Sequence, residues 1–356
     1  MTDTKARLLL VDDDAGQLTE LHDRIKERLD GADVTIDVWR PSFETPVREE
    51  LIKQLQPRPT LVVTDHDLTE NGAAGLFGGT IISWCRAHAI PVGDYSRKLS
   101  EDLEEPDMFE FRFESEPAKA AEEIAELFLG FRQLAEMLTH EPEQELDSWS
   151  QSLAAALGRE QAASSFSLYS VRAGASHVDA IERLQKELGE AEARRLLEIY
   201  VVGHLLRNGI LRYAGPIMSE EVLCSYLAIS ETNADAVAEL FASARYEGPF
   251  GQRKRYFWQE DVDDVIADLA DAATLEGDIG EDQFRRVVMQ AHLEPGTHEC
   301  PRCEGIRGGF RCPYTNRTTC ERSDCSVPST SWVPQGAYLT RVEKDYYERW
   351  APLLGL

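Results

Sequence analysis

The sequence has no apolar run that approaches the roughly 20 residues of a membrane-spanning helix. It also lacks the apolar stretch of a secretory signal near its start, where MTDTKARLLLVDDD places acidic residues instead. We therefore expect a cytoplasmic protein without a membrane partner.

Basic residues are scarce as well. The chain has 37 Lys and Arg residues against 64 Asp and Glu residues, which gives a formal net charge of -27. A field of this sign repels phosphate backbones, so DNA binding would require a local basic patch. The composition therefore favours protein partners and leaves DNA as a less favoured possibility.

No internal repeat or long low-complexity tract is evident, and 356 residues suffice for two or three packed domains. In the first third, short β-rich apolar runs alternate with amphipathic stretches, and a last helix is expected to begin near Pro117. This alternation predicts an α/β domain with a doubly wound parallel sheet and helices on both faces. The five expected strands are 7–11, 34–39, 60–65, 90–95 and 108–113.

Acidic residues follow the first and third of these strands. Asp12 and Asp13 come directly after the first strand, and Asp65 comes at the end of the third. Because ligands of doubly wound sheets bind beyond the carboxyl ends of the strands, we expect these carboxylates to share one pocket. Their mutual repulsion calls for a hard cation such as Mg²⁺. A simpler interpretation of the first acids is a helix N-cap, but it does not account for Asp65.

These residues resemble those of the receiver domains of two-component response regulators, a family with a flavodoxin-like fold. VDDD is similar to the paired acids that hold Mg²⁺ in the family, here Asp12 and Asp13. TDHDLTENGAAG resembles the loop of the phosphoacceptor aspartate, which would be Asp65, and PVGDYS places Ser96 at the Ser/Thr switch position. The resemblance covers roughly residues 7 to 134 and implies a bacterial signalling protein that a histidine kinase or another partner controls.

The sequence departs from the family after the fifth strand. Receivers have a Lys followed by Pro there, whereas FRFESEP places Glu114 or Ser115 at this position. A carboxylate repels a phosphoryl group where a Lys would attract it. Two alternatives therefore stay open: a working phosphoacceptor, and a pseudo-receiver that serves as an adaptor subunit of a larger complex.

An enzymatic alternative uses the same acids. Asp65-His66-Asp67-Leu68-Thr69 fits the DxDxT pattern of haloacid-dehalogenase-like phosphatases, in which the first Asp is the nucleophile and the second the acid/base. This would make the protein a Mg²⁺-dependent phosphatase. However, that motif normally follows the first strand of its sheet, and VDDD would then have no role. We therefore favour a regulator without catalytic turnover.

Five of the seven cysteines lie close together near the C-terminal end, and CPRC at Cys300 and Cys303 has the spacing of a zinc knuckle. Without a signal peptide, this clustering favours a metal site over disulfides. We expect a structural Zn²⁺ with a closed shell of four ligands. The further candidates are Cys312, Cys320, Cys325 and His298.

Between these ends, two short helices, capped by Ser219 and Ser230, precede PFGQRKRYFW, which predicts a small hairpin. This order is the outline of a winged helix. Arg253, Lys254 and Arg255 form a basic cluster that could contact DNA, although a solvated hairpin face is the simpler interpretation.

The sequence therefore predicts a protein of four parts. They are a receiver-like domain (1–137), a helical region (138–214), a winged-helix-like domain (215–290) and a zinc-binding module (291–356). We expect the first part to control protein recruitment or transcription by the others.

Overall fold

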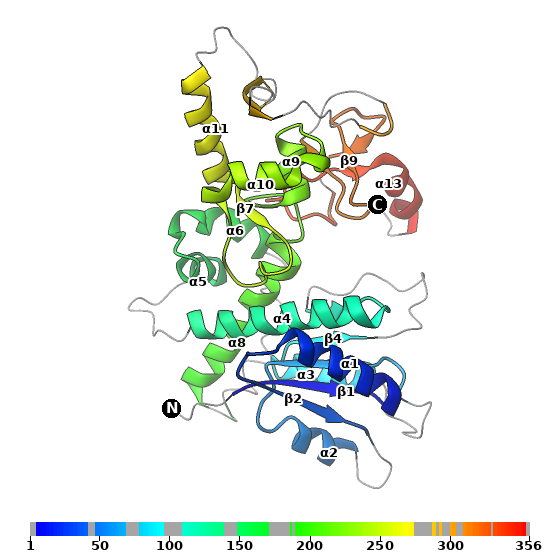
Figure 1. Ribbon diagram of the computed structural model, residues 1–356. Helices are drawn as coiled ribbons and strands as arrows, with labels where there is room; N and C mark the ends of the chain where they lie inside the picture. Colours follow the sequence, from blue (N-terminus) through cyan, green and yellow to red (C-terminus); the bar gives the residue numbers. More distant parts are fainter. Residues whose placement is uncertain are drawn as a thin grey trace. The chain divides into compact units, whose positions relative to one another are not determined.

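The computed structural model describes twelve stretches of the chain. The chain divides into two compact units (Figure 1). Unit 1 contains Met1–Ser152 and Arg172–Leu205, and unit 2 contains Leu153–Val171 and Leu206–Leu356. The described residues are 5–41, 47–68, 78–95, 109–138, 148–170, 186, 189–273, 287–289, 292–293, 300–303, 309–328 and 330–353.

Unit 1 is built on the predicted parallel sheet, with five strands in the order β2-β1-β3-β4-β5. This order, with a helix after each of the first three strands, fits a flavodoxin-like domain. The strands are β1 (Ala6–Val11), β2 (Val34–Trp39), β3 (Leu61–Thr64), β4 (Val92–Asp94) and β5 (Phe111–Arg112). The helices of this unit are α1 (Ala15–Arg28), α2 (Val47–Gln54), α3 (Gly78–Ala87), α4 (Pro117–Met137) and α8 (Glu190–His204).

Both faces of the central strands β1, β3 and β4 are buried, as their continuous apolar runs predict, whereas the edge strand β2 is partly exposed. Leu9 and Val11 of β1 pack in one cluster with Leu51 of α2 and Ile81 of α3. Leu8 and its alternate neighbours point to the opposite face, where α1 and α4 contact each other (Figure 1). The sheet is therefore covered by helices on both sides.

A long helix closes this domain. It begins at Pro117, as predicted, because the fixed φ of proline suits the first helical turn. Its buried Phe131 packs against Gly203 of α8, where a Cβ atom added to the glycine would lie 2.2 Å from the ring. The missing side chain of this glycine therefore permits the close approach of α4 and α8.

Unit 2 is mostly helical, with very short strands. The π-helical segment Leu205–Ile210 leads into β6 (Ile217–Ser219), α9 (Glu220–Tyr226), α10 (Ala234–Leu240), β7 (Tyr256–Trp258) and α11 (Gln259–Ala273). Buried Leu223, Phe241 and Phe257 form part of one core with residues of α11. Earlier in the chain lie α5 (Trp149–Ala156) and α6 (Ala163–Ser170).

The predicted hairpin within residues 249–258 is found only in part. Only its last three residues form a strand, β7, and this strand pairs antiparallel with β6. Phe257 also forms an antiparallel bridge with Arg245. The backbone N–H of Tyr246 also donates to the carbonyl oxygen of Tyr256 at 2.8 Å. The turn residues therefore lie in a loop that a local antiparallel pairing closes, and β7 pairs in addition with the more distant β6.

The last part of unit 2 holds two small antiparallel pairs, β8–β9 and β10–β11, and a short helix. Their bounds are β8 (Phe310–Arg311), β9 (Thr318–Thr319), β10 (Ser326–Val327), β11 (Val342–Glu343) and α13 (Lys344–Trp350). Such short strands bury little apolar area, so this region needs another source of order.

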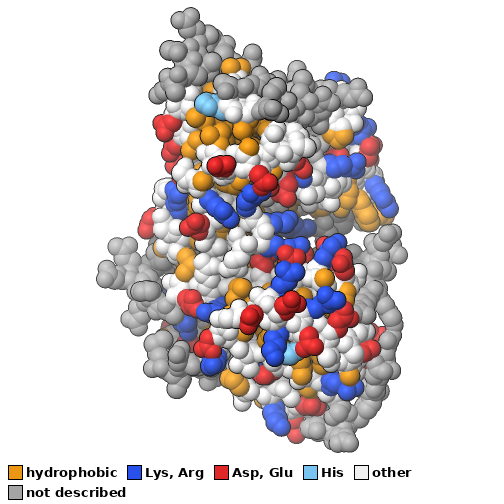
Figure 2. Space-filling view, in the orientation of Figure 1, with side chains coloured by type: hydrophobic (Ala, Val, Ile, Leu, Met, Phe, Trp, Pro, Cys, Tyr) orange, Lys and Arg blue, Asp and Glu red, His pale blue; other side chains and the backbone are white. Residues whose placement is uncertain are grey.

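Acidic and basic side chains alternate over the face of the protein seen in Figure 2, without a large area of one sign. The acids are thus mostly solvated parts of helices, as their spread through the sequence indicates. Among the described helices, none has the length and apolar character to cross a membrane.

Candidate functional site

The acids that follow β1 and β3 come together at one edge of the sheet. Val11 of β1 lies beside Thr64 of β3 in the parallel register, so the residues after them are neighbours. Carboxylate oxygens of Asp12, Asp13 and Asp65 lie within 4.8 Å of one another. The predicted convergence of these three residues is therefore observed.

Asp14 has a different role from its two neighbours. Its carboxylate accepts hydrogen bonds from the backbone N–H groups of Gly16 and Gln17, at 2.7 and 3.0 Å, and so caps α1. Asp12 and Asp13 are instead 4% and 5% exposed. The N-cap interpretation thus applies to Asp14, and the two buried acids belong to the pocket.

The ionisation of Asp65 is strongly perturbed. The pKa of this carboxyl is raised from 3.8 to about 7, first by burial and then by the nearby charge of Asp12, while a hydrogen bond from the backbone of His66 opposes this rise. Asp94 and Asp13 add smaller contributions of the same sign. Asp65 thus lies among like charges that a bound cation would offset.

Asp94 is a member of this pocket that the sequence analysis did not single out. It is the last residue of β4, and its register partner is Thr64, next to Asp65. Burial raises the pKa of Asp94, and the nearby His66 and Arg112 oppose this rise. The signal was present in PVGDYS, where an acid ends an apolar run.

Other predicted members of this site are less well placed. Ser96 and Thr69 lie outside the described residues, and Asp67 is half-buried. Glu114 is exposed after β5. Lys119, the lysine that follows it, pairs with Glu114 and Glu116 at 3.4 and 3.3 Å.

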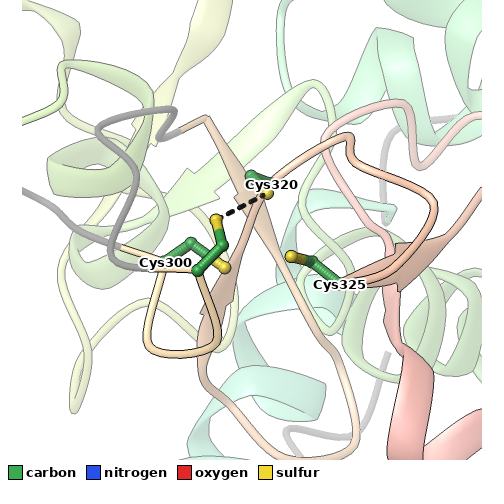
Figure 3. A group of neighbouring side chains, drawn as sticks. Cys300, Cys320 and Cys325 are labelled. Carbon is green, nitrogen blue, oxygen red and sulfur yellow. Dashed lines mark hydrogen bonds between the residues drawn. The ribbon is translucent and has the colours of Figure 1, made fainter.

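A second site brings together four of the five clustered cysteines. The sulfur atoms of Cys300, Cys303, Cys320 and Cys325 lie within 4.8 Å of one another. Figure 3 shows Cys300, Cys320 and Cys325 reaching a common centre from separate segments. All four are free thiols, and Cys303 and Cys320 are 3.7 Å apart, sulfur to sulfur.

This arrangement fits a tetrahedral metal ion. A Zn–S distance of about 2.3 Å gives sulfur–sulfur separations of about 3.8 Å, close to the observed spacing. Burial raises the pKa values of Cys320 and Cys325, so neutral thiols are favoured unless a cation is bound. The four cysteines could therefore hold a metal such as zinc, which stabilises thiolates.

Cys312 is not a member of this group. It is buried beside β8, and its sulfur accepts a hydrogen bond from the backbone N–H of Glu343 at 3.4 Å. His298, the other alternative ligand, lies outside the described residues. The spacing of the cysteines alone left this choice open.

One member of the predicted basic cluster, Arg255, is held in ion pairs within the protein. Arg255 pairs with Glu220 and Asp235, the latter at 2.7 Å. Lys254 lines a pocket with Glu221, while Arg253 is half-exposed. At least one of the three charges is thus largely neutralised within the protein.

No protein-family model matches this chain, and no curated protein matches its sequence. The site must therefore be interpreted from its own geometry.

Proposed function

We propose that unit 1 is a receiver-like regulatory domain in which Asp65 is the phosphoacceptor and Asp12 and Asp13 help to hold Mg²⁺. The observation that carries this proposal is the meeting of three carboxylates from two strand ends within 4.8 Å. Such a group of oxygens suits a hard divalent cation.

The chain's own residues would prepare Asp65 for this reaction. A phosphoryl acceptor must be ionised, and the raised pKa of Asp65 means that its ionised form is disfavoured near neutral pH. A cation held by Asp12 and Asp13 would restore the ionised form. In the transfer step, an oxygen of Asp65 would form the new P–O bond while the bond to the donor's leaving group breaks.

The remainder of the chain would then serve as output, with a structural zinc ion in its cysteine group. Protein partners agree best with the net charge of -27. The pairing of Arg255 with two carboxylates further disfavours DNA as the partner. Thus we propose a bacterial signalling protein that acts by recruitment and has no turnover of its own.

Incubation with acetyl phosphate and Mg²⁺, followed by intact mass measurement, tests this proposal. We expect the mass of one phosphoryl group to be added to the wild-type chain and to Asp67→Asn. We expect no addition to Asp65→Asn. A folded wild-type chain that stays unmodified would refute the phosphoacceptor role and favour the pseudo-receiver adaptor.

A further inference from the structure

A pocket in unit 2 has a charge opposite to that of the protein as a whole. It has a volume of about 240 Å³, and the described residues that line it include four cations, Arg207, Arg212, Lys254 and Arg311, and one carboxylate, Glu221. Arg207 lies in the π-helical segment and Arg212 shortly after it. Lys254 lies in the loop before β7, and Arg311 lies in β8. In a chain with a net charge of -27, such convergence is unusual.

The pKa of Glu221 indicates the electrostatic potential inside this pocket. Burial by itself raises the pKa of this carboxyl, yet its pKa is lowered overall. Hydrogen bonds from Ser219 and the backbone, together with the charges of Lys254 and Arg311, cause this reversal. The pocket therefore stabilises negative charge.

Arg311 is fixed before any ligand arrives. It is only 7% exposed, its Nε donates to Oδ1 of Asn316 at 2.8 Å, and its Nη1 donates to Glu231 at 2.6 Å. Glu231 balances this charge in part. Arg311 is therefore a preorganised cation in the wall of the pocket.

The other walls suit a small organic group. The ring of Tyr256 is buried, and Leu211 and Val222 add apolar surface. The volume is below the roughly 300–1,000 Å³ of pockets for drug-sized ligands. A compact ligand with one strongly anionic end matches this combination of size, charge and apolar surface.

We propose that this pocket binds a small phosphorylated molecule, with its phosphoryl group among the four cations that line the pocket, Arg207, Arg212, Lys254 and Arg311. Arginine and lysine are the usual partners of phosphate oxygens. The same site could not admit a DNA duplex, because its volume is that of a small molecule. This assigns unit 2 a ligand of its own, independent of any reaction at Asp65.

The test is calorimetric titration of the full-length, zinc-loaded chain with glycerol phosphate at constant ionic strength. Lys254→Ala removes a cation that lines the pocket, and Arg253→Ala removes the neighbouring cation, which does not line it. Both positions lie outside the buried core, so both variants should fold. We expect saturable binding to the wild type and to Arg253→Ala, and about tenfold weaker binding to Lys254→Ala.

Three results would overturn the proposal. They are no saturable binding of glycerol phosphate, an equal loss of affinity in both variants, and binding of a DNA duplex without binding of glycerol phosphate. Repeating the titration with Asp65→Asn separates this site from the sheet domain, because the pocket should bind equally well in that variant.

Discussion

Ionisation of the Asp65 carboxyl destabilises the folded chain. The pKa of this carboxyl is about 7 in the folded chain against 3.8 ordinarily, so the folded state holds its proton more tightly. Stability therefore falls as pH rises from about 4 to about 7. We expect Asp65→Asn to raise the free energy of unfolding at pH 8 by about 1 kcal/mol, after allowance for solvent screening. Urea denaturation at pH 4 and pH 8 measures this gain.

The gain should disappear near pH 4, where the wild-type carboxyl is protonated in the folded chain. Mg²⁺ should stabilise the wild type at pH 8 and have little effect on Asp65→Asn. An equal gain at both pH values would show that packing, and not charge, explains the effect.

Asp14 offers a contrast within the same acidic run. Its carboxylate caps α1, so Asp14→Ala should cost about 1 kcal/mol of stability. Labelling of Asp65 by acetyl phosphate should persist in this variant and be reduced in Asp12→Ala. If Asp14→Ala abolished labelling in a folded chain, our separation of cap and pocket would be wrong.

At the scale of elements, the sequence predicted the five-stranded parallel sheet because its strands are local apolar runs. The meeting of Asp12 with Asp65 followed from the rule for strand ends. The place of Asp94 depends on the register between β3 and β4, and the pairing of β7 with β6 depends on contacts between distant segments. Local patterns do not encode such pairings, so the predicted hairpin was found only in part and the pairing of β7 with β6 was not expected.

The start of α3 supports the loop that carries Asp65. A Cβ atom on Gly78 would lie 2.1 Å from the backbone oxygen of Asp65, whereas a Cβ atom on Gly79 would meet nothing within 4 Å. We expect Gly78→Ala to lower the free energy of unfolding by about 1–3 kcal/mol and to reduce phosphoryl labelling. Gly79→Ala is the matched control and should stabilise by about 0.5–1 kcal/mol. Similar behaviour of the two variants in thermal melts would contradict this account.

At the scale of the whole molecule, order in the two units has different sources. Unit 1 has a sheet covered on both faces, whereas the strands described in the last part of unit 2 have two residues each and accompany one short helix, α13. A metal ion adds free energy where apolar burial is small. Loss of the ion should therefore disorder residues 309–328 and leave the sheet of unit 1 folded.

The variants Cys303→Ser and Cys312→Ser, which replace one cysteine each, test whether a metal ion orders the last part of unit 2. Cys303 belongs to the four-cysteine group and Cys312 does not, so the first variant should lose zinc and the second should keep about one zinc per chain by elemental analysis. Hydrogen exchange should become faster in residues 309–328 of Cys303→Ser and of the chelated wild type. Protection of β1 and β3 should stay unchanged, because their hydrogen bonds lie within the sheet of unit 1. Zinc loss without faster exchange in residues 309–328 would show that the ion does not order this region.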